Sequence, residues 1–139
     1  YATPDAVFAL PETGLGLIPG GGGTQRLGAV VGASRAMDLL LTGERIDARR
    51  AFDIGLVTRL ADRVDTLISE VTGLAQRIAL RPPTATLFAK QAARAAGRLD
   101  LKSGLDLELD LFAMLAPMDD VKEAALAFRE KRAPRFTGA

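Results

Sequence analysis

A run of glycines directly after a single acid constrains this chain more than any other feature. Residues 10–27 read LPETGLGLIPGGGGTQRL, with Glu12 near the start and four consecutive glycines at 20–23. Glycine has no Cβ, so its backbone reaches conformations closed to other residues and lets a ligand approach closely. The segment therefore predicts a tight connection between a short strand at residues 6–10 and a following helix.

Two familiar phosphate-binding loops do not fit these glycines. A P-loop of the form GxxxxGK(S/T) needs a lysine after its last glycine, and no lysine lies near this segment. The dinucleotide fingerprint GxGxxG fails as well, because Gly14 and Gly16 are followed by Pro19 where a third glycine is required. The loop is therefore not expected to bind a nucleotide in either of these ways.

Two interpretations of Glu12 remain open at this point. It is either a solvated surface acid in a tight connection, which is the usual fate of an isolated glutamate, or part of a catalytic wall. The second interpretation rests on its neighbours, since apolar side chains disfavour the carboxylate anion and glycine N–H groups at a helix start can orient a polar ligand. These apolar neighbours are Leu10, Pro11, Leu15, Leu17 and Ile18.

The composition removes several other kinds of chemistry. The chain has no histidine and no cysteine, which excludes a Ser-His-Asp triad, a thiolate nucleophile and a metal site built on those residues. Acid–base work near neutral pH must then fall to Glu, Asp, Lys or Tyr1. The net charge of +1 argues against a broad basic face for nucleic acid, and no apolar run approaches a bilayer span. We expect no nucleic-acid partner, no membrane partner and a cytoplasmic location.

The pattern of caps and glycines predicts three short helices before residue 56. Thr24, Ser34 and Asp47 are the expected N-caps, and the helices end near Gly32, Gly43 and Gly55. Residues 56–60 alternate in polarity and predict a short strand.

The rest of the chain is predicted to be helical. Apolar residues recur with helical spacing over 64–78, residues 84–97 are alanine-rich, and a last helix runs from Asp119 or Asp120 to about Arg132. Residues 104–111, GLDLELDL, alternate like a strand. We expect a helix there because acids are poor strand formers, and it would be apolar on more than one side, as suits a contact with another subunit.

The three acids of this segment invite a comparison with metal sites. On a helix Asp106 and Asp110 share a face, whereas Glu108 points elsewhere and Lys102 lies four residues before Asp106. We therefore expect no metal site.

Two longer segments carry a resemblance to a known family. PETGLGLIPGGGGTQRL, followed by LLLTGERIDARRAFDIGLV, resembles the crotonase superfamily, in particular its enoyl-CoA hydratase/isomerase branch, and the resemblance continues through AALAFREKRAPRF. It implies an α/β fold in which residues 1–62 form the end of a crotonase-like ββα spiral core, with the catalytic Glu and the glycine-rich loop. Residues 63–139 would form a helical carboxyl-terminal region for trimerisation and for covering the acyl-CoA pocket. Family members are longer, so the chain would correspond to their carboxyl-terminal half.

The resemblance also implies an activity and a set of site residues. Enoyl-CoA hydratases of this family add water across the 2,3 double bond of a 2-enoyl-CoA thioester, using a pair of glutamates and a backbone oxyanion hole. Glu12 matches the glutamate that moves the proton at the α-carbon, and Gly20 matches a loop glycine that positions the reacting groups. The other glutamate and the oxyanion hole would lie upstream of this chain.

The implied substrate contacts lie in two places. Pro11, Leu15 and Leu17 would contact the acyl-CoA substrate, while Phe128 and Lys131 match an F-x-x-K pair that reaches coenzyme A bound to a neighbouring subunit. The alternative for Lys131 is a solvated cation that complements the dipole at a helix end. No cofactor is implied beyond the coenzyme A of the substrate.

Two alternatives to the hydratase stay open. The first is a Δ3,Δ2-enoyl-CoA isomerase or another crotonase-type enzyme, because the second glutamate that would discriminate them is not in this chain. The second is an inactive fragment that acts only as a trimerisation module. The family expectation for assembly is a homo-oligomer, either a trimer or a dimer of trimers.

Overall fold

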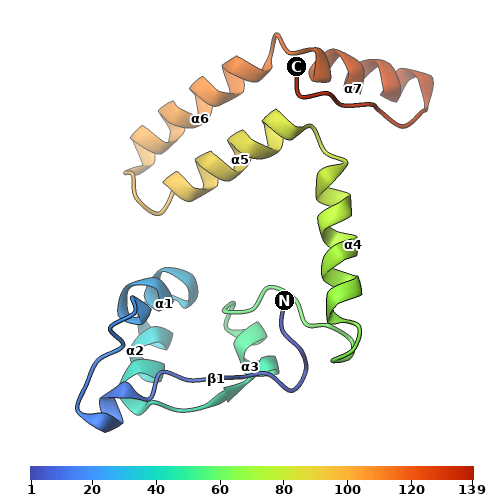
Figure 1. The fold of residues 1–139 in the computed structure, drawn as a ribbon. Helices are drawn as coiled ribbons and strands as arrows, with labels where there is room; N and C mark the ends of the chain where they lie inside the picture. Colours follow the sequence, from blue (N-terminus) through green and yellow to red (C-terminus); the bar gives the residue numbers. More distant parts are fainter. The chain divides into compact units, whose positions relative to one another are not determined.

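The computed structural model describes residues 1–139 and divides them into two compact units (Figure 1). The first unit comprises Tyr1–Thr72 and the second Gly73–Ala139. The functional division at residues 62 and 63, with a catalytic part and a helical assembly part, stays a prediction.

The first unit contains one small sheet and several short helices. Strand β1 pairs antiparallel with β2, with Val7 opposite Asp47 and Phe8 opposite Ile46. In chain order the elements are β1 (Val7–Phe8), the 3-10 helix η1 (Glu12–Leu15), α1 (Gly23–Val31), α2 (Ala33–Thr42), β2 (Ile46–Asp47), α3 (Ala48–Asp53) and the beginning of α4 (Leu67–Ala79). The strand expected at residues 6–10 is thus present but limited to β1.

The strand predicted at residues 56–60 is wrong. The backbone there is irregular, and only Leu60 forms an isolated parallel bridge, with Ala2. The Ala2 N–H donates to the Arg59 carbonyl at 3.1 Å and the Ala61 N–H donates to the Ala2 carbonyl at 2.9 Å. The physical reason is that β2, which the polarity pattern did not predict, pairs with β1, while residues 56–60 form a single bridge and otherwise bond back to α3, where the Val57 N–H donates to the Ala51 carbonyl at 3.0 Å.

Of the three predicted N-caps, only Asp47 is confirmed. Its carboxylate accepts a hydrogen bond from the Arg50 N–H at 2.7 Å, which satisfies an otherwise unpaired amide at the start of α3. The caps at Thr24 and Ser34 are wrong. Helix α1 begins two residues earlier than a cap at Thr24 would allow, with Gly22 at φ +88° as its N-cap. Gly32, at φ +85°, is both the C-cap of α1 and the N-cap of α2. Glycine backbone conformations therefore replace side-chain caps at both positions.

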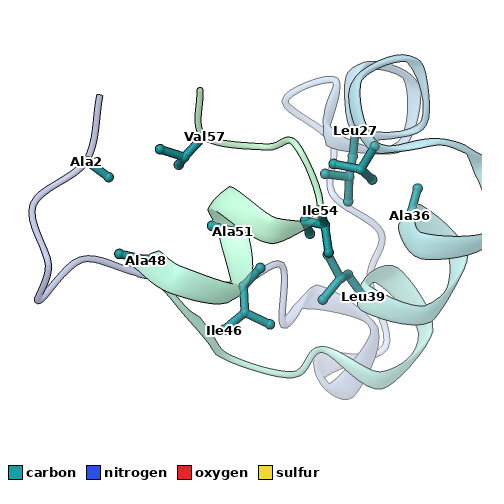
Figure 2. Packing of buried hydrophobic residues seen from close by; sticks show 10 residues of the cluster. Ala2, Leu27, Ala36, Leu39, Ile46, Ala48, Ala51, Ile54 and Val57 are labelled. Atoms are coloured by element: carbon teal, nitrogen blue, oxygen red, sulfur yellow. The ribbon is translucent and has the colours of Figure 1, made fainter. Parts of the chain in front are cut away.

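A small apolar core holds the first unit together. Figure 2 shows Leu27 of α1, Leu39 of α2 and Ile54 just after α3 among its labelled side chains, with Ala51 of α3 fully buried. Burying a leucine or isoleucine side chain contributes about 1.5–3 kcal/mol each, so these contacts supply much of the unit's stability. The core fixes α2, against which the segment that begins at Glu12 is anchored.

The second unit is built from helices. It contains the end of α4, then α5 (Pro83–Ala95), α6 (Leu101–Leu115) and α7 (Asp119–Glu130). Helices α5 and α6 lie side by side (Figure 1). The helical predictions for 64–78, 84–97 and 104–111 are confirmed within a few residues at the ends, and α6 includes the ambiguous segment.

Helix α6 is apolar on more than one side, as its sequence predicts. Leu111 is buried, whereas Leu105, Leu109 and Phe112 are more than half exposed. The cover expected from another subunit stays a prediction. No helix of the structure combines the length and the apolar character needed to cross a bilayer.

Helix α7 is shorter at its end than predicted. It stops at Glu130 rather than near Arg132, because Lys131 adopts a left-handed backbone with φ +55°. The chain then reverses, and the last residues return to the start of the helix. The Asp120 carboxylate, which is buried, accepts the Thr137 N–H at 2.8 Å and the Gly138 N–H at 2.9 Å.

Candidate functional site

Glu12 is the first residue of the short helix η1. The Leu17 N–H donates to the Glu12 carbonyl at 3.0 Å, and Gly16, at φ +73°, closes the turn. The Thr13 hydroxyl donates to the Leu40 carbonyl of α2 at 2.9 Å, so the turn is tied to a helix of the core. Glu12 is therefore held on a fixed backbone although it lies in a connection.

The carboxylate of Glu12 has an unusual environment. The side chain is partly buried, and its Oε2 atom is buried without any hydrogen-bond partner in the structure. It is the only buried side-chain oxygen or nitrogen in the chain left in this condition. Buried polar atoms are nearly always paired, and an exception in a native fold calls for an explanation such as a catalytic role or a ligand that completes the pairing. This observation favours a functional Glu12 over a solvated surface acid.

The glycine loop lies between η1 and α1. Gly23 packs so closely that a Cβ there would lie 3.0 Å from Pro19 Cβ and 3.2 Å from Leu10 Cδ1. At Gly20, by contrast, a Cβ would meet only the Ile18 carbonyl oxygen, at 3.9 Å. A Cβ at position 23 would therefore force its apolar neighbours to shift slightly, while Gly20 presents an uncovered backbone.

The predicted acyl-contact residues do not form a closed wall in this chain. Pro11 is exposed, and Leu15 and Leu17 are 74% and 65% exposed. Pro11 lies against Gly43, where a Cβ would come within 3.2 Å of the Pro11 Cα. The three residues share the segment of Glu12, and their role as substrate contacts stays a prediction.

Phe128 and Lys131 belong to the second compact unit, at the end of α7. Phe128 is 86% exposed and Lys131 is exposed as well. Phe128 lies in α7 and Lys131 is the residue that ends it, and the Lys131 N–H donates to the Phe128 carbonyl at 3.3 Å. Both side chains are exposed and three residues apart, and their role as a contact for coenzyme A stays a prediction.

Sequence reasoning missed the contacts that fix the end of α7. Arg132 donates to both oxygens of Glu123, from Nη1 to Oε1 at 2.6 Å and from Nη2 to Oε2 at 2.9 Å. These bonds, with one from the Arg135 N–H, lower the pKa of Glu123 to about 2. The only signal in the sequence was the opposite charges of Glu123 and Arg132, nine residues apart. These two side chains meet only because the chain reverses at Lys131.

Sequence reasoning also missed an apolar cavity in the first unit. Its volume is about 560 Å³, and Val7, Leu10, Val30 and Ile46 are among its lining residues. Glu12 does not line it, so the cavity is not the site of that carboxylate.

No group of three or more acids is placed to hold a metal ion. Within the acidic segment of α6, Asp106 accepts a hydrogen bond from the Lys102 ammonium at 2.8 Å, which supports the helical pairing expected there.

Comparisons with known proteins agree with these features. The family profile described as Enoyl-CoA hydratase/isomerase matches residues 1–139. The mitochondrial enoyl-CoA hydratase of Pongo abelii is 43% identical over 136 residues, which are 98% of this chain and 47% of that protein. A short-chain-enoyl-CoA hydratase of Clostridioides difficile is 41% identical over 92% of this chain and 82% of its own length.

The structural comparison leads to the same family. The crystal structure of an enoyl-CoA hydratase from Bacillus anthracis superposes with a TM-score of 0.93 at 37% identity, over 99% of this chain and 53% of that one. The chain therefore spans about half the length of most of these relatives, as expected for the last part of a crotonase-like spiral followed by helices. The predicted fold class is confirmed, and the chain belongs to the enoyl-CoA hydratase/isomerase family of the crotonase superfamily.

Proposed function

We propose that these residues are the carboxyl-terminal half of an enoyl-CoA hydratase, which adds water across the 2,3 double bond of a 2-enoyl-CoA thioester. The observation that carries the proposal is the buried, unpartnered Oε2 of Glu12 on its anchored turn. The names of the similar proteins support it, since the relatives described above are called enoyl-CoA hydratases.

In the proposed reaction Glu12 transfers the proton at the α-carbon of the thioester. An acid in this role must reach the carbon directly, and the unpartnered Oε2 of Glu12 would have no hydrogen bond to break before doing so. As the enolate forms, negative charge develops on the thioester oxygen and must be stabilised by an oxyanion hole. The second glutamate and the donors of that hole would come from residues outside this chain.

The remaining parts of the chain would serve binding. Gly20 would let the reacting groups approach the loop, and Pro11, Leu15 and Leu17 would contact the substrate. Phe128 would pack against the nucleotide end of coenzyme A, and Lys131 would neutralise a phosphate as a point charge. Coenzyme A enters as part of the substrate, and no other cofactor is proposed.

We further propose that the protein is a cytoplasmic homo-oligomer, either a trimer or a dimer of trimers. The exposed apolar side chains of α6 support a contact between copies, since apolar surface of this kind is buried in stable assemblies. The molar mass of the intact protein in solution, measured by light scattering, tests the assembly.

The decisive experiment compares Glu12→Gln with Glu44→Gln in the intact natural protein. The first change keeps the shape of the side chain but removes the proton-transferring group, so turnover of a short 2-enoyl-CoA should fall by about 100-fold or more. Glu44 is exposed and is not a predicted site residue, so its variant should retain turnover. Full activity of Glu12→Gln would refute the proposed role.

The product distinguishes the reaction types in the same assay. A hydratase product carries the added mass of one water, whereas an isomerase product has the mass of its substrate. Absence of turnover in an unaltered protein whose intact mass equals 14.7 kDa would favour the assembly module over either enzyme.

A further inference from the structure

Lys131 has a backbone conformation that no other side-chain-bearing residue of this chain adopts. It is the only non-glycine residue with a positive φ, at +55°, whereas every other such position is a glycine. The left-handed region costs a residue with a Cβ about 1–2 kcal/mol, and helices that end this way usually do so on glycine or asparagine. Strained backbones concentrate at functional sites, so the lysine at this position is a candidate for a functional side chain.

Two backbone hydrogen bonds stabilise the left-handed conformation of Lys131 in part. The N–H of Lys131 donates to the Phe128 carbonyl at 3.3 Å, and the N–H of Arg132 donates to the Ala127 carbonyl at 3.1 Å. These bonds satisfy carbonyl groups at the end of α7. They are the bonds that a glycine at this position would also make, so they do not by themselves explain how a lysine is kept there.

Glu123 supplies the additional restraint. Its two oxygens accept the bidentate pair from Arg132, and its Oε1 also accepts the Arg135 N–H at 2.7 Å. One carboxylate on α7 therefore holds the chain by hydrogen bonds at Arg132, the residue after Lys131, and again at Arg135. We call these three contacts the Glu123 clamp.

The Glu123 clamp is better protected from water than the other ion pairs of the second unit. The Glu123 and Arg132 side chains are 20% and 37% exposed, compared with 86% and 63% for the Lys102–Asp106 pair. Partial burial and bidentate geometry are the conditions under which an ion pair holds a defined geometry.

We propose that Glu123 is a positioning residue for coenzyme A, because the Glu123 clamp fixes the left-handed turn that sets the direction in which the Lys131 side chain leaves the end of α7, three residues after Phe128. The inference rests on the proposed function, in which this pair contacts coenzyme A. Glu123 itself would not touch the ligand. Its effect on binding would pass through Lys131 alone.

A double-mutant cycle on the intact natural protein tests this dependence, with coenzyme A as the probe and calorimetry as the readout. Glu123→Gln should weaken coenzyme A binding by about fivefold, because a neutral amide forms weaker bonds with the guanidinium. Lys131→Gly should weaken binding by about tenfold. The double variant should bind no more weakly than Lys131→Gly, because the clamp has no other route to the ligand.

Glu130→Gln is the matched control. Glu130 also accepts a hydrogen bond from Arg132, at 2.6 Å from Nε. Unlike Glu123, it does not accept the Arg135 N–H. Its variant should therefore bind coenzyme A as the unaltered protein does. Amide hydrogen exchange at Arg135 reports whether the clamp has opened in each variant, independently of binding.

The outcomes separate the two levels of the argument. Unchanged binding in Lys131→Gly would overturn the proposed role of Lys131. Weaker binding in that variant with unchanged binding in Glu123→Gln would overturn the positioning role alone. If Glu123→Gln weakens coenzyme A binding by the same factor in the Lys131→Gly background as in the unaltered protein, Glu123 acts as general structural support and the inference is wrong. Should Glu123→Gln fail to fold, Arg132→Lys, which keeps the charge but not the bidentate pair, replaces it in the same cycle.

Discussion

Two neighbouring glycines of the loop should respond differently to the same substitution. Gly22 has φ +88°, and a Cβ there would lie 2.7 Å from Arg26 Nη1. Gly21 has no positive φ, and a Cβ there would meet nothing within 4 Å. The pair therefore tests the loop conformation with an identical chemical change, glycine to alanine, at adjacent positions.

The cost at Gly22 can be assembled from two contributions. The left-handed backbone costs alanine about 1 kcal/mol or somewhat more. Arg26 must also move, which breaks its 2.6 Å hydrogen bond to the Gly21 carbonyl, and an exposed bond of this kind is worth roughly 0.5–1 kcal/mol. Gly22→Ala should therefore destabilise the first unit by about 2 kcal/mol. Gly21→Ala should be neutral or stabilise by about 0.5 kcal/mol, because alanine restricts the unfolded chain.

Amide hydrogen exchange of α1 and α2 measures the free energy of opening in the unit that carries the loop. Equal effects of the two variants, or destabilisation by Gly21→Ala alone, would refute the assigned conformation. The comparison needs no assumption about activity, since both glycines lie outside the predicted site residues.

Three further predictions concern caps and carboxylates. Asp47→Ala should destabilise α3 by about 1 kcal/mol, measured by denaturant unfolding, because the Arg50 amide loses its cap. Asp120→Ala should release the end of the chain, seen as faster exchange of the Gly138 amide, because a buried acceptor of two backbone N–H groups disappears. The pKa of Glu123 is lowered from 4.5 to about 2, so its contribution to stability is complete above pH 4.5 and is lost as the pH falls toward 2. Glu123→Gln should abolish this pH dependence, which a titration of tail amide exchange would show.

The long helices could be predicted from the sequence because their apolar spacing extends over many residues. The segment GLDLELDL shows how such a pattern resolves an ambiguity. Its alternation fits a strand, but its acids and its apolar flanks favour α6, which the structure contains.

The short elements were less predictable because each depends on contacts between distant residues. Thr24 and Ser34 have the chemistry of caps, yet the preceding glycines take that place through backbone conformation. Residues 56–60 have strand-like alternation but lack a continuous partner, since β2 pairs with β1. A polarity pattern describes one segment and does not specify its partner.

The candidate site, too, was predictable only where a local sequence motif describes it. The motif around Glu12 indicates the residue, but the isolation of its Oε2 follows from packing that no local pattern contains. The bond between Glu123 and Arg132 is equally invisible in the sequence, because it depends on a reversal of the chain at a lysine.

At Lys131, with its left-handed backbone, the requirements of stability and of coenzyme A binding conflict. Glycine at position 131 would relieve about 1 kcal/mol of backbone strain, so a laboratory selection for heat resistance alone should enrich Lys131→Gly. A selection for growth on a substrate that requires thioester turnover should instead retain the lysine. Parallel populations evolved under the two regimes should therefore diverge at this position, and variants recovered from the first should have gained thermal tolerance while losing affinity for coenzyme A.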